Sequence, residues 1–442
     1  MSTFDLDQSL RQRIANARLL AEDGQVLQAE LVALAVLDVL PTQAEALSLL
    51  VELALQRGDA PRAVSFLEVV VRAHPGSTRA AMDLAMVQLH ADQPRAAQAT
   101  LETVLAVVPS DHVAWLMLSQ VRSGLGQSRG ALQAQFEAVT RAQRSGQWLD
   151  ETSTPPQLLD AVVVAIERIR GNRRELLVAM VDDMREVHGP LALQRVDRAL
   201  AGYLRDWDST PSDPRQRPKF FFFPGLPNPP YHDPYLQPWA RQLQAAFPEI
   251  RHEALRIVEE DRRLPDFIPD HLPVEKYVSG VAPVPSWEAF FFFRHGERYD
   301  TNHARCPRTS TVLENIELCR IENQAPEILF SVLKPGSHIN PHHGVSNVRL
   351  VMHLPLVVPP GCALNLIDHG EHRWTEGQLV MFDDTYLHEA WNRSSQTRIV
   401  LLMDCWNPHL MGIERSAVKR LIETITALKL ADRAVRGVNR AE

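Results

Sequence analysis

The first third of this 442-residue chain repeats itself every 34 residues, and no other feature of the sequence constrains the fold as strongly. The positions that keep this register are small or helix-ending residues: Ala29, Ala63, Ala97 and Ala131; Gly24, Gly58 and Gly126, with Asp92 in place of one glycine; and Pro41, Pro75 and Pro109. Apolar residues recur between them at helical spacing, for instance Leu47, Leu50 and Leu53. Small residues let two helices approach closely, glycine permits the turn between them, and proline ends the second helix. The period therefore predicts a stack of helical hairpins.

This period and pattern resemble the tetratricopeptide repeat over roughly residues 10–142. The resemblance implies an α-helical solenoid, with 1–142 as the repeat domain, whose concave face binds a protein or peptide partner. A generic helical bundle is the alternative interpretation. Residues 143–217 are expected to add further helix and then a linker, because Tyr203 to Pro218 is polar and punctuated by prolines.

The pattern changes to β-type runs after Pro218. Short apolar or β-branched runs, broken by proline and glycine, occur at Phe220–Phe223, Ala289–Phe293, Ile328–Leu333, Val348–Val358, Ala363–Ile367, Gln378–Phe382 and Thr397–Met403. Short strands with turn signals between them predict an all-β sandwich or barrel, here over residues 218–410. A helical pattern then closes the chain over residues 411–442.

Charge and composition exclude several classes of partner. The net charge of −8 provides no basic footprint for nucleic acid. The N-terminus lacks the basic and apolar regions of a signal peptide, and no apolar run is long enough for a transmembrane segment. The four cysteines show no close-spaced zinc pattern and are too few to staple a chain of this length. A reduced, cytoplasmic location is therefore expected.

Two histidines and an arginine mark the chemistry of the β region. His342 and His388 lie at opposite ends of a strand-rich segment, and Arg398 follows ten residues after the second histidine. Side chains alternate along a strand, so Arg398 faces away from Ile399. A buried arginine is costly unless it is paired, and a carboxylate that accepts two hydrogen bonds would satisfy its fork. These residues predict a metal site beside a pocket for a carboxylate ligand.

The same region resembles the aspartyl/asparaginyl β-hydroxylase family. The resemblance covers roughly Pro218 to Leu410 and includes Phe223-Pro-Gly-Leu-Pro, Phe382-Asp-Asp and Asp404-Cys-Trp-Asn-Pro, in order and at fixed spacings. It implies a double-stranded β-helix (jelly-roll) that uses iron(II), 2-oxoglutarate and O₂ to hydroxylate an unactivated C–H bond. The implied substrate is the β-carbon of an aspartyl or asparaginyl residue in a protein or peptide. The alternatives are a lipid-linked acyl chain or small molecule as substrate, or a non-catalytic repeat scaffold with a degenerate barrel.

The resemblance also assigns roles to individual residues. His342 and His388 are the implied iron ligands, with water in the vacant coordination place. Asp384 is expected to orient that water or a ligand imidazole, and Arg349 is expected to face the substrate. The implied pocket for 2-oxoglutarate consists of Trp287, Ser331, His353 and Arg398. Plain core packing is the alternative for Trp287.

Two departures bear on these assignments. Most 2-oxoglutarate oxygenases have a carboxylate two residues after the first histidine, whereas this chain has Gly344. The resembled family also has glycine there, but Asp383 or Asp384 as a direct third ligand is a competing interpretation. Arg349, Val351 and His353 share one face of their strand, expected to be the inner one. Val351 stands where many members of the family have a second arginine, which argues against an acidic substrate.

Overall fold

The computed structural model describes residues 3–269 and 271–438, with side chains described for 8–269 and 271–429. Its contacts divide the chain into two compact units, one ending at Ala179 and the other beginning at Met180. The expected linker at Tyr203 to Pro218 therefore lies within the second unit. The three finer boundaries expected from the sequence, after residues 142, 217 and 410, stay predictions. No helix in the described ranges combines the length and the apolarity needed to cross a bilayer.

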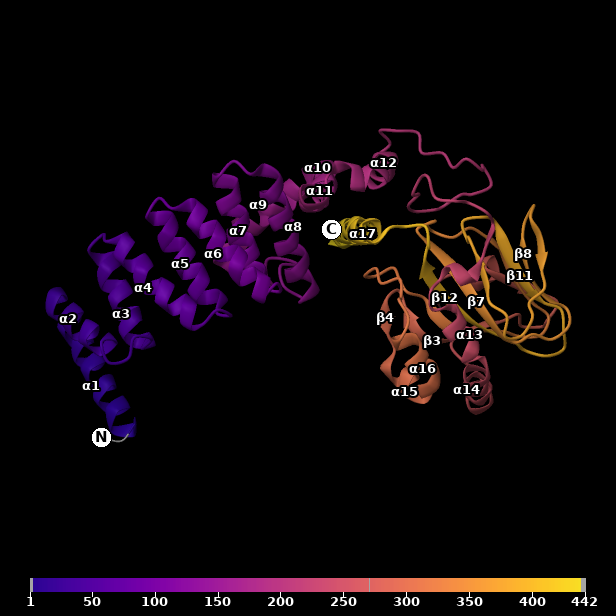
Figure 1. Cartoon of the computed structure of the whole chain (residues 1–442), viewed down its shortest axis with the longest axis horizontal. Coiled ribbons are helices and arrows are strands. Elements are labelled where there is room, and N and C mark those ends of the chain that lie inside the picture. The colour runs from indigo at the N-terminus through magenta and orange to yellow at the C-terminus, as the bar shows by residue number, and fades with distance from the viewer. Residues whose placement is uncertain (1–2, 270, 439–442) are drawn as a thin grey trace. The chain divides into compact units, whose positions relative to one another are not determined.

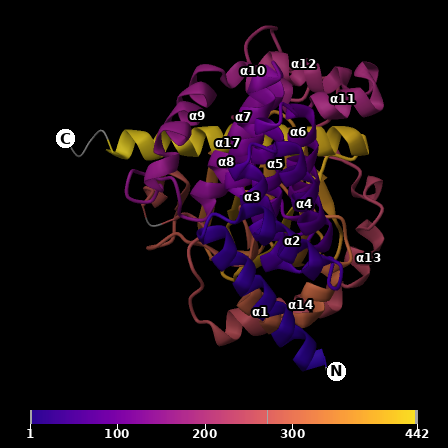
Figure 2. The same ribbon diagram turned by 90° about the vertical axis from the view of Figure 1, so that its left-hand side faces the viewer.

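The first unit is a stack of antiparallel helical hairpins, as the 34-residue period predicts (Figures 1 and 2). Consecutive helices pair as α1 (Thr3–Glu22) with α2 (Val26–Leu37), α3 (Ala44–Gln56) with α4 (Ala60–Ala73), α5 (Thr78–His90) with α6 (Pro94–Val107), and α7 (His112–Gly124) with α8 (Ser128–Arg144). The helices α9 (Leu159–Gly171) and α10 (Arg173–Ala179) follow in the same unit. The unit is thus a helical repeat array of the expected kind.

The repeated residues explain the geometry of the hairpins. The alanines at the four equivalent positions are completely buried, so helix pairs pack closely at these points. Gly24, Gly58 and Gly126 adopt φ angles of 78°, 73° and 74°, in the left-handed region that glycine enters without steric cost. Asp92 occupies the same turn with a φ of 56°, a conformation that costs energy for a residue with a β-carbon.

The second unit contains short helices, two sheets and a long C-terminal helix (Figure 1). Its helices are α11 (Asp182–His188), α12 (Gln194–Tyr203), α13 (Ala240–Ala245), α14 (Phe247–Glu260), α15 (Asp300–Arg305), α16 (Pro307–Glu314) and α17 (Gly412–Val438). Its strands are β1 (Tyr231–His232), β2 (Val278–Gly280), β3 (Trp287–Arg294), β4 (Glu297–Arg298), β5 (Ile328–Leu333), β6 (Ser337–His342), β7 (Arg349–Val357), β8 (Cys362–Leu366), β9 (Gly370–His372), β10 (Val380–Phe382), β11 (His388–Asn392) and β12 (Arg398–Trp406).

The strands form two antiparallel sheets that pack face to face. The larger sheet has the order β1-β10-β7-β12-β5-β3-β4, and the smaller has the order β2-β6-β11-β8-β9. One apolar cluster joins the facing sides of the sheets and contains Leu333 and Phe382 from the larger sheet and Ile339 and Leu364 from the smaller. This two-layered arrangement confirms the expected jelly-roll.

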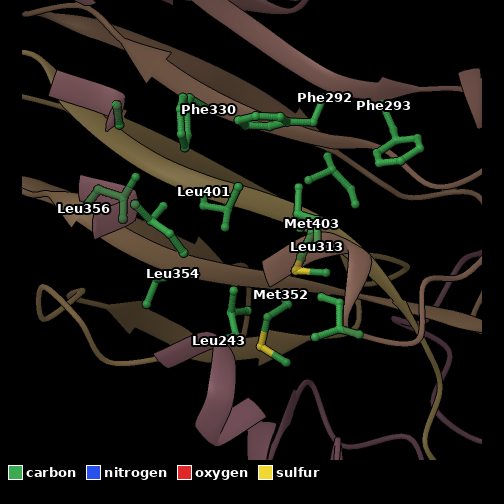
Figure 3. Packing of buried hydrophobic residues seen from close by; sticks show 14 of the residues in the cluster. Leu243, Phe292, Phe293, Leu313, Phe330, Met352, Leu354, Leu356, Leu401 and Met403 are labelled. Carbon is green, nitrogen blue, oxygen red and sulfur yellow. The ribbon is translucent and has the colours of Figure 1, made fainter. Parts of the chain in front are cut away.

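Helices cover the outer face of the larger sheet. Leu243 of α13 and Leu313 of α16 pack in one cluster with Met352, Leu401 and Met403 of the central strands (Figure 3). Because side chains alternate along β7 and β12, the residues between these apolar ones point to the space between the sheets. The prediction that Arg349, Val351 and His353 share the inner face is confirmed, since all three line an internal cavity.

One expected strand is wrong. Residues 220–223 form no strand of either sheet and make only an isolated bridge from Phe221 to Ser346. Their backbone N–H groups are used elsewhere, because Phe220 donates to the carbonyl of Val345 and Phe223 donates to the side chain of Asn347. The expected helix at the C-terminus is present as α17, and residues 439–442 of that expectation lie outside the described residues.

Candidate active site

A cavity of about 300 Å³ lies between the two sheets of the second unit. Its walls include every residue to which the sequence assigned a role at the site: Trp287, Ser331, His342, Arg349, His353, Asp384, His388 and Arg398. These residues come from β3, β5, β6, β7, β11, β12 and the turn before β11. The fold thus gathers into one cavity side chains that are up to 111 positions apart in the sequence.

The two predicted metal ligands face each other across the smaller sheet. His342 ends β6, His388 begins β11, and the two residues are Cα partners in the antiparallel ladder. Their ring centroids are 4.1 Å apart. In each ring Nδ1 lies next to a backbone carbonyl two residues earlier, at 2.8 Å in His342 and 2.9 Å in His388. A carbonyl only accepts hydrogen bonds, so each Nδ1 carries the proton and each Nε2 keeps a free lone pair.

Burial keeps both imidazoles neutral. It lowers the pKa of His342 and holds the pKa of His388 well below its ordinary value, because the charged form loses its hydration. A neutral imidazole is the form that binds a metal. Among the described residues, no three histidine, cysteine, aspartate or glutamate side chains come together in a way that could hold a metal ion. The residues present fit a site with two protein ligands.

The side chain of Asp384 fills the space beside Gly344, the residue that follows His342 and His343. A β-carbon on Gly344 would lie only 2.0 Å from the carboxyl carbon of Asp384. Burial raises the pKa of Asp384 to about 8, and its Oδ1 has no hydrogen-bond partner among the described residues. An unpartnered buried carboxyl oxygen needs a donor, and a bound water would supply one.

Asp383 is engaged in the turn instead. Its Oδ1 accepts hydrogen bonds from the backbone N–H and the hydroxyl of Thr385, at 2.9 and 2.5 Å. Its Oδ2 accepts one from Nε2 of Gln216 at 2.6 Å. Asp383 does not line the cavity, whereas Asp384 does. Of the two candidate acids, only Asp384 is therefore placed to act on a ligand in the cavity.

Arg398 is a buried cation without an acidic partner. It is 1% exposed, and no carboxylate in the described part of the chain acts on its guanidinium. Nη1 donates to the hydroxyl and carbonyl oxygens of Ser331 at 3.2 and 3.3 Å, and Nε has no partner. Burial lowers the pKa of Arg398 to about 10. A fork that is charged, buried and incompletely satisfied fits a carboxylate ligand.

The neighbours of Arg398 complete a mostly neutral pocket. Trp287 stacks on Phe267, with ring centroids 3.9 Å apart, and its Nε1 donates to the hydroxyl of Ser331 at 2.9 Å. Trp287 therefore packs against an aromatic neighbour, as the core-packing alternative expects, and also bonds a residue of the predicted 2-oxoglutarate pocket. Neither ring nitrogen of His353 has a partner among the described residues, and burial lowers the pKa of His353 to about 3. The guanidinium of Arg398 lies close enough to His353 to contribute to this lowering of its pKa.

Arg349 has a partner that was not anticipated. Its Nη1 donates to the carboxylate of Asp404 and to the backbone carbonyl of Gln324. Asp404 also lines the cavity and accepts a hydrogen bond from the backbone N–H of Glu327 at 3.0 Å. Alternation could have identified Asp404, since it lies six residues after Arg398 and therefore on the same side of β12. A second contact was also not anticipated. The guanidinium carbon of Arg398 lies 5.3 Å from the centroid of the Trp374 ring, and no pattern in the sequence indicated this contact.

Residues 244–408 match the family described as aspartyl/asparaginyl beta-hydroxylase, and residues 54–121 match the tetratricopeptide repeat. The chain carries an aspartyl/asparaginyl β-hydroxylase domain. The family resemblance stated from the sequence is thereby confirmed, together with the helical repeats. Relatives matched through this domain are named as hydroxylases.

Three relatives illustrate the range of the family. An ornithine lipid ester-linked acyl 2-hydroxylase of Rhizobium tropici is 32% identical over 185 residues, covering 41% of this chain and 62% of that protein. The human aspartate beta-hydroxylase domain-containing protein 2 is 30% identical over 230 residues, covering 51% and 59%. The human aspartyl/asparaginyl beta-hydroxylase is 29% identical over 197 residues, covering 41% and 24%. The chain thus spans less than two thirds of the length of each of these relatives.

Proposed function

We propose that the β unit is an iron(II)- and 2-oxoglutarate-dependent dioxygenase that hydroxylates an unactivated C–H bond. One observation carries this proposal: two neutral histidines with free Nε2 atoms share a cavity with the buried Arg398, which has no acidic partner among the described residues. Iron and 2-oxoglutarate, when bound, would supply the activation of O₂, with release of succinate and CO₂. The protein would supply position, charge and exclusion of water.

Each residue has a distinct part in this proposal. His342 and His388 would hold iron through Nε2, while their Nδ1 hydrogen bonds fix the orientation of the rings. Arg398 would bind the far carboxylate of 2-oxoglutarate with its planar fork, assisted by the hydroxyl of Ser331. Trp287 would keep that hydroxyl in place, and Asp384 would hold a water next to the metal.

Two substrate classes are candidates. The family favours β-hydroxylation of an aspartyl or asparaginyl residue in a protein or peptide, as predicted from the sequence. One observation favours a lipid-linked acyl chain or another uncharged substrate. Arg349 is already paired with Asp404, and Val351 adds an apolar wall, so Arg349 offers no free charge to a substrate carboxylate. A relative named as an acyl 2-hydroxylase is consistent with this second candidate.

The helical repeats are proposed to bind a protein or peptide partner, the usual role of such arrays. Such a partner would be either the substrate itself or a protein that brings the enzyme to it. Pull-down experiments would compare the proteins captured by the intact chain with those captured by a variant altered at exposed positions of the repeat face. Loss of a captured protein in the variant would indicate a binding role and not a purely structural one.

The function is tested on the purified full chain. Anaerobic titration with iron(II) and then 2-oxoglutarate should show saturable binding of both. Admission of O₂ should then release succinate, and acyl substrates compared with aspartyl peptides should stimulate this release to different extents. A protein that binds neither iron(II) nor 2-oxoglutarate would instead be a repeat scaffold with a degenerate barrel. Mass spectrometry of a cell extract treated with the enzyme would reveal products that gain one oxygen.

A further inference from the structure

A short segment that precedes the matched residues 244–408 crosses the turn after His342 and the turn before His388. This segment, residues 216–223, is called the clasp below. The backbone N–H of Arg217 donates to the carbonyl of Thr385 at 2.8 Å, in the turn before His388. The N–H of Lys219 donates to the carbonyl of Gly344 at 3.1 Å, in the turn after His342. One continuous stretch of backbone therefore bridges two turns whose bonded residues, Gly344 and Thr385, are 41 positions apart in the sequence.

Gln216 fixes the first end of the clasp with its side chain. It is 2% exposed and forms an isolated bridge with Tyr386. Its Nε2 donates to Oδ2 of Asp383 at 2.6 Å, and Oδ1 of the same carboxylate holds the N–H of Thr385. The amide of Gln216 thus braces the turn from which Asp384 and His388 project.

The other end of the clasp is anchored to the turn that follows His342. Phe220 and Phe221 both donate their backbone N–H to the carbonyl of Val345, at 2.9 and 3.1 Å. Phe223 exchanges two hydrogen bonds of 2.8 Å with the side chain of Asn347. Both ends are therefore held by several bonds, and a relative shift of the turns would have to break them.

The pairing of the two histidine strands is irregular beside the predicted ligands. β6 and β11 pair at His342 and His388, but the register shifts between His388 and Ala390, so the ladder is irregular directly beside the metal ligands. A metal with two protein ligands depends on the separation and orientation of both, since no third side chain corrects an error. The two turns also meet directly, because the N–H of Gly344 donates to the carbonyl of Asp384 at 2.6 Å and Nδ1 of His343 lies 2.8 Å from the carbonyl of Thr385. The clasp adds a second connection beside these bonds.

We propose that the clasp sets the geometry of His342 and His388 for metal binding, with Gln216 as a positioning residue that acts through Asp383. This inference rests on the proposed metal-dependent function. It extends the functional unit to residues before 244, where the family match begins, and residues 218–223 of the clasp lie within the broader resemblance seen in the sequence. Gln216 touches neither the ligands nor the cavity, so its effect is transmitted by the turn.

The test is a cobalt(II) titration of the full chain, because the visible absorption of cobalt(II) reports both occupancy and ligand geometry. Gln216→Leu should weaken cobalt(II) binding about tenfold and alter the absorption bands, in line with the effect of outer partners of metal ligands. Gln237→Leu is the matched control. Gln237 is also buried and donates its Nε2 to a backbone carbonyl, that of Trp406 at 2.7 Å, which belongs to β12 and to neither turn. The control should lose stability and keep wild-type affinity.

A rescue and a metal-free measurement complete the test. Gln216→Glu places two carboxylates face to face and should weaken binding, whereas Gln216→Glu with Asp383→Asn restores an amide–carboxylate hydrogen bond and should recover most of it. In metal-free protein, Gln216→Leu should speed amide exchange in the turns at 343–346 and 383–387, and the control should not. Unchanged affinity and exchange in Gln216→Leu, or equal losses in the control, would overturn the clasp. Failure of the wild type to bind cobalt(II), with the exchange result as expected, would instead contradict the proposed metal function.

Discussion

The carboxyl carbon of Asp384 lies 2.0 Å from the point where Gly344 would carry a β-carbon. The two residues therefore share one space, and a carboxylate from the turn before β11 stands where a side chain from the turn after β6 would otherwise be. Glycine is required at position 344 by this close approach. The relationship explains how a site with two histidines can lack an acid in the usual sequence position and still have one in the cavity.

Gly344→Asp should therefore lower turnover, although it creates the sequence pattern of a three-ligand site. The added side chain must displace Asp384, and overpacking of this kind costs about 1–3 kcal/mol. Gly344→Ala separates the two effects, since it adds bulk without a ligand and should also reduce activity. Succinate release and thermal unfolding measure these outcomes. Wild-type turnover in Gly344→Asp would count against the two-histidine site.

His342→Ala and His388→Ala should each abolish metal binding and turnover, whereas His343→Ala should keep substantial activity. Of these three residues, only His342 and His388 combine a free Nε2 with an Nδ1 that lies next to a backbone carbonyl two residues earlier. Nδ1 of His343 instead contacts the carbonyl of Thr385 at 2.8 Å. Metal content after dialysis, measured with succinate release, distinguishes the three variants. An inactive His343→Ala with normal fold and metal content would show that the ligand assignment is wrong or incomplete.

Arg398→Ala should weaken 2-oxoglutarate binding at least tenfold and leave metal binding nearly intact. Breaking a buried charge pair costs about 2–5 kcal/mol, and about 1.4 kcal/mol corresponds to tenfold in affinity. Arg398→Lys should recover only part of the loss, because an ammonium keeps the charge and loses the planar fork. Anaerobic calorimetric titration measures both. Equal affinity in Arg398→Ala and the wild type would remove Arg398 from the pocket.

His232 should contribute to a loss of stability of the β unit on acidification. Burial, with a smaller effect of His409, lowers the pKa of His232 from 6.5 to about 4, and its Nε2 has no partner among the described residues. Below pH 6.5 the unfolded chain binds the proton first, so stability is lost as the pH falls from about 6.5 to 4. At about 1.4 kcal/mol per pKa unit, the loss is on the order of 3 kcal/mol.

His232→Phe should flatten this part of the pH dependence, measured by calorimetric unfolding from pH 7 to pH 4. His252→Phe is the control, since His252 is exposed in the same unit and should leave the profile unchanged. A His232→Phe profile parallel to that of the wild type would contradict the assignment of the pH dependence to this residue.

Asp92→Gly should stabilise the repeat unit by about 0.5–1 kcal/mol. Asp92 has a φ of 56° in the turn where the other hairpins have glycine, and glycine adopts this conformation without a β-carbon penalty. Asp83→Gly, within the helix α5, should destabilise the same unit by a similar amount. Urea unfolding of both variants measures the difference. Destabilisation by Asp92→Gly would mean that the aspartate side chain contributes more than the strain costs.

Local periodicity is what the sequence by itself determined. The 34-residue register predicts the helical hairpins because each repeat builds its own contacts with the next one along the chain. Alternation in β7 and β12 likewise predicts that Arg349, His353 and Arg398 point inward, since neighbouring residues of a strand must face opposite sides. The cavity residues were identifiable because they interrupt otherwise apolar strands.

Only the tertiary structure decided which of these side chains are paired. The bond from Gln216 to Asp383 spans 167 positions, and the ion pair of Arg349 with Asp404 spans 55. The expected strand at 220–223 failed for the same reason, because its backbone bonds go to turns far along the chain. Periodicity reports which face of an element is buried. It carries no information about which distant group meets that face, because that depends on how the folded chain brings remote segments together.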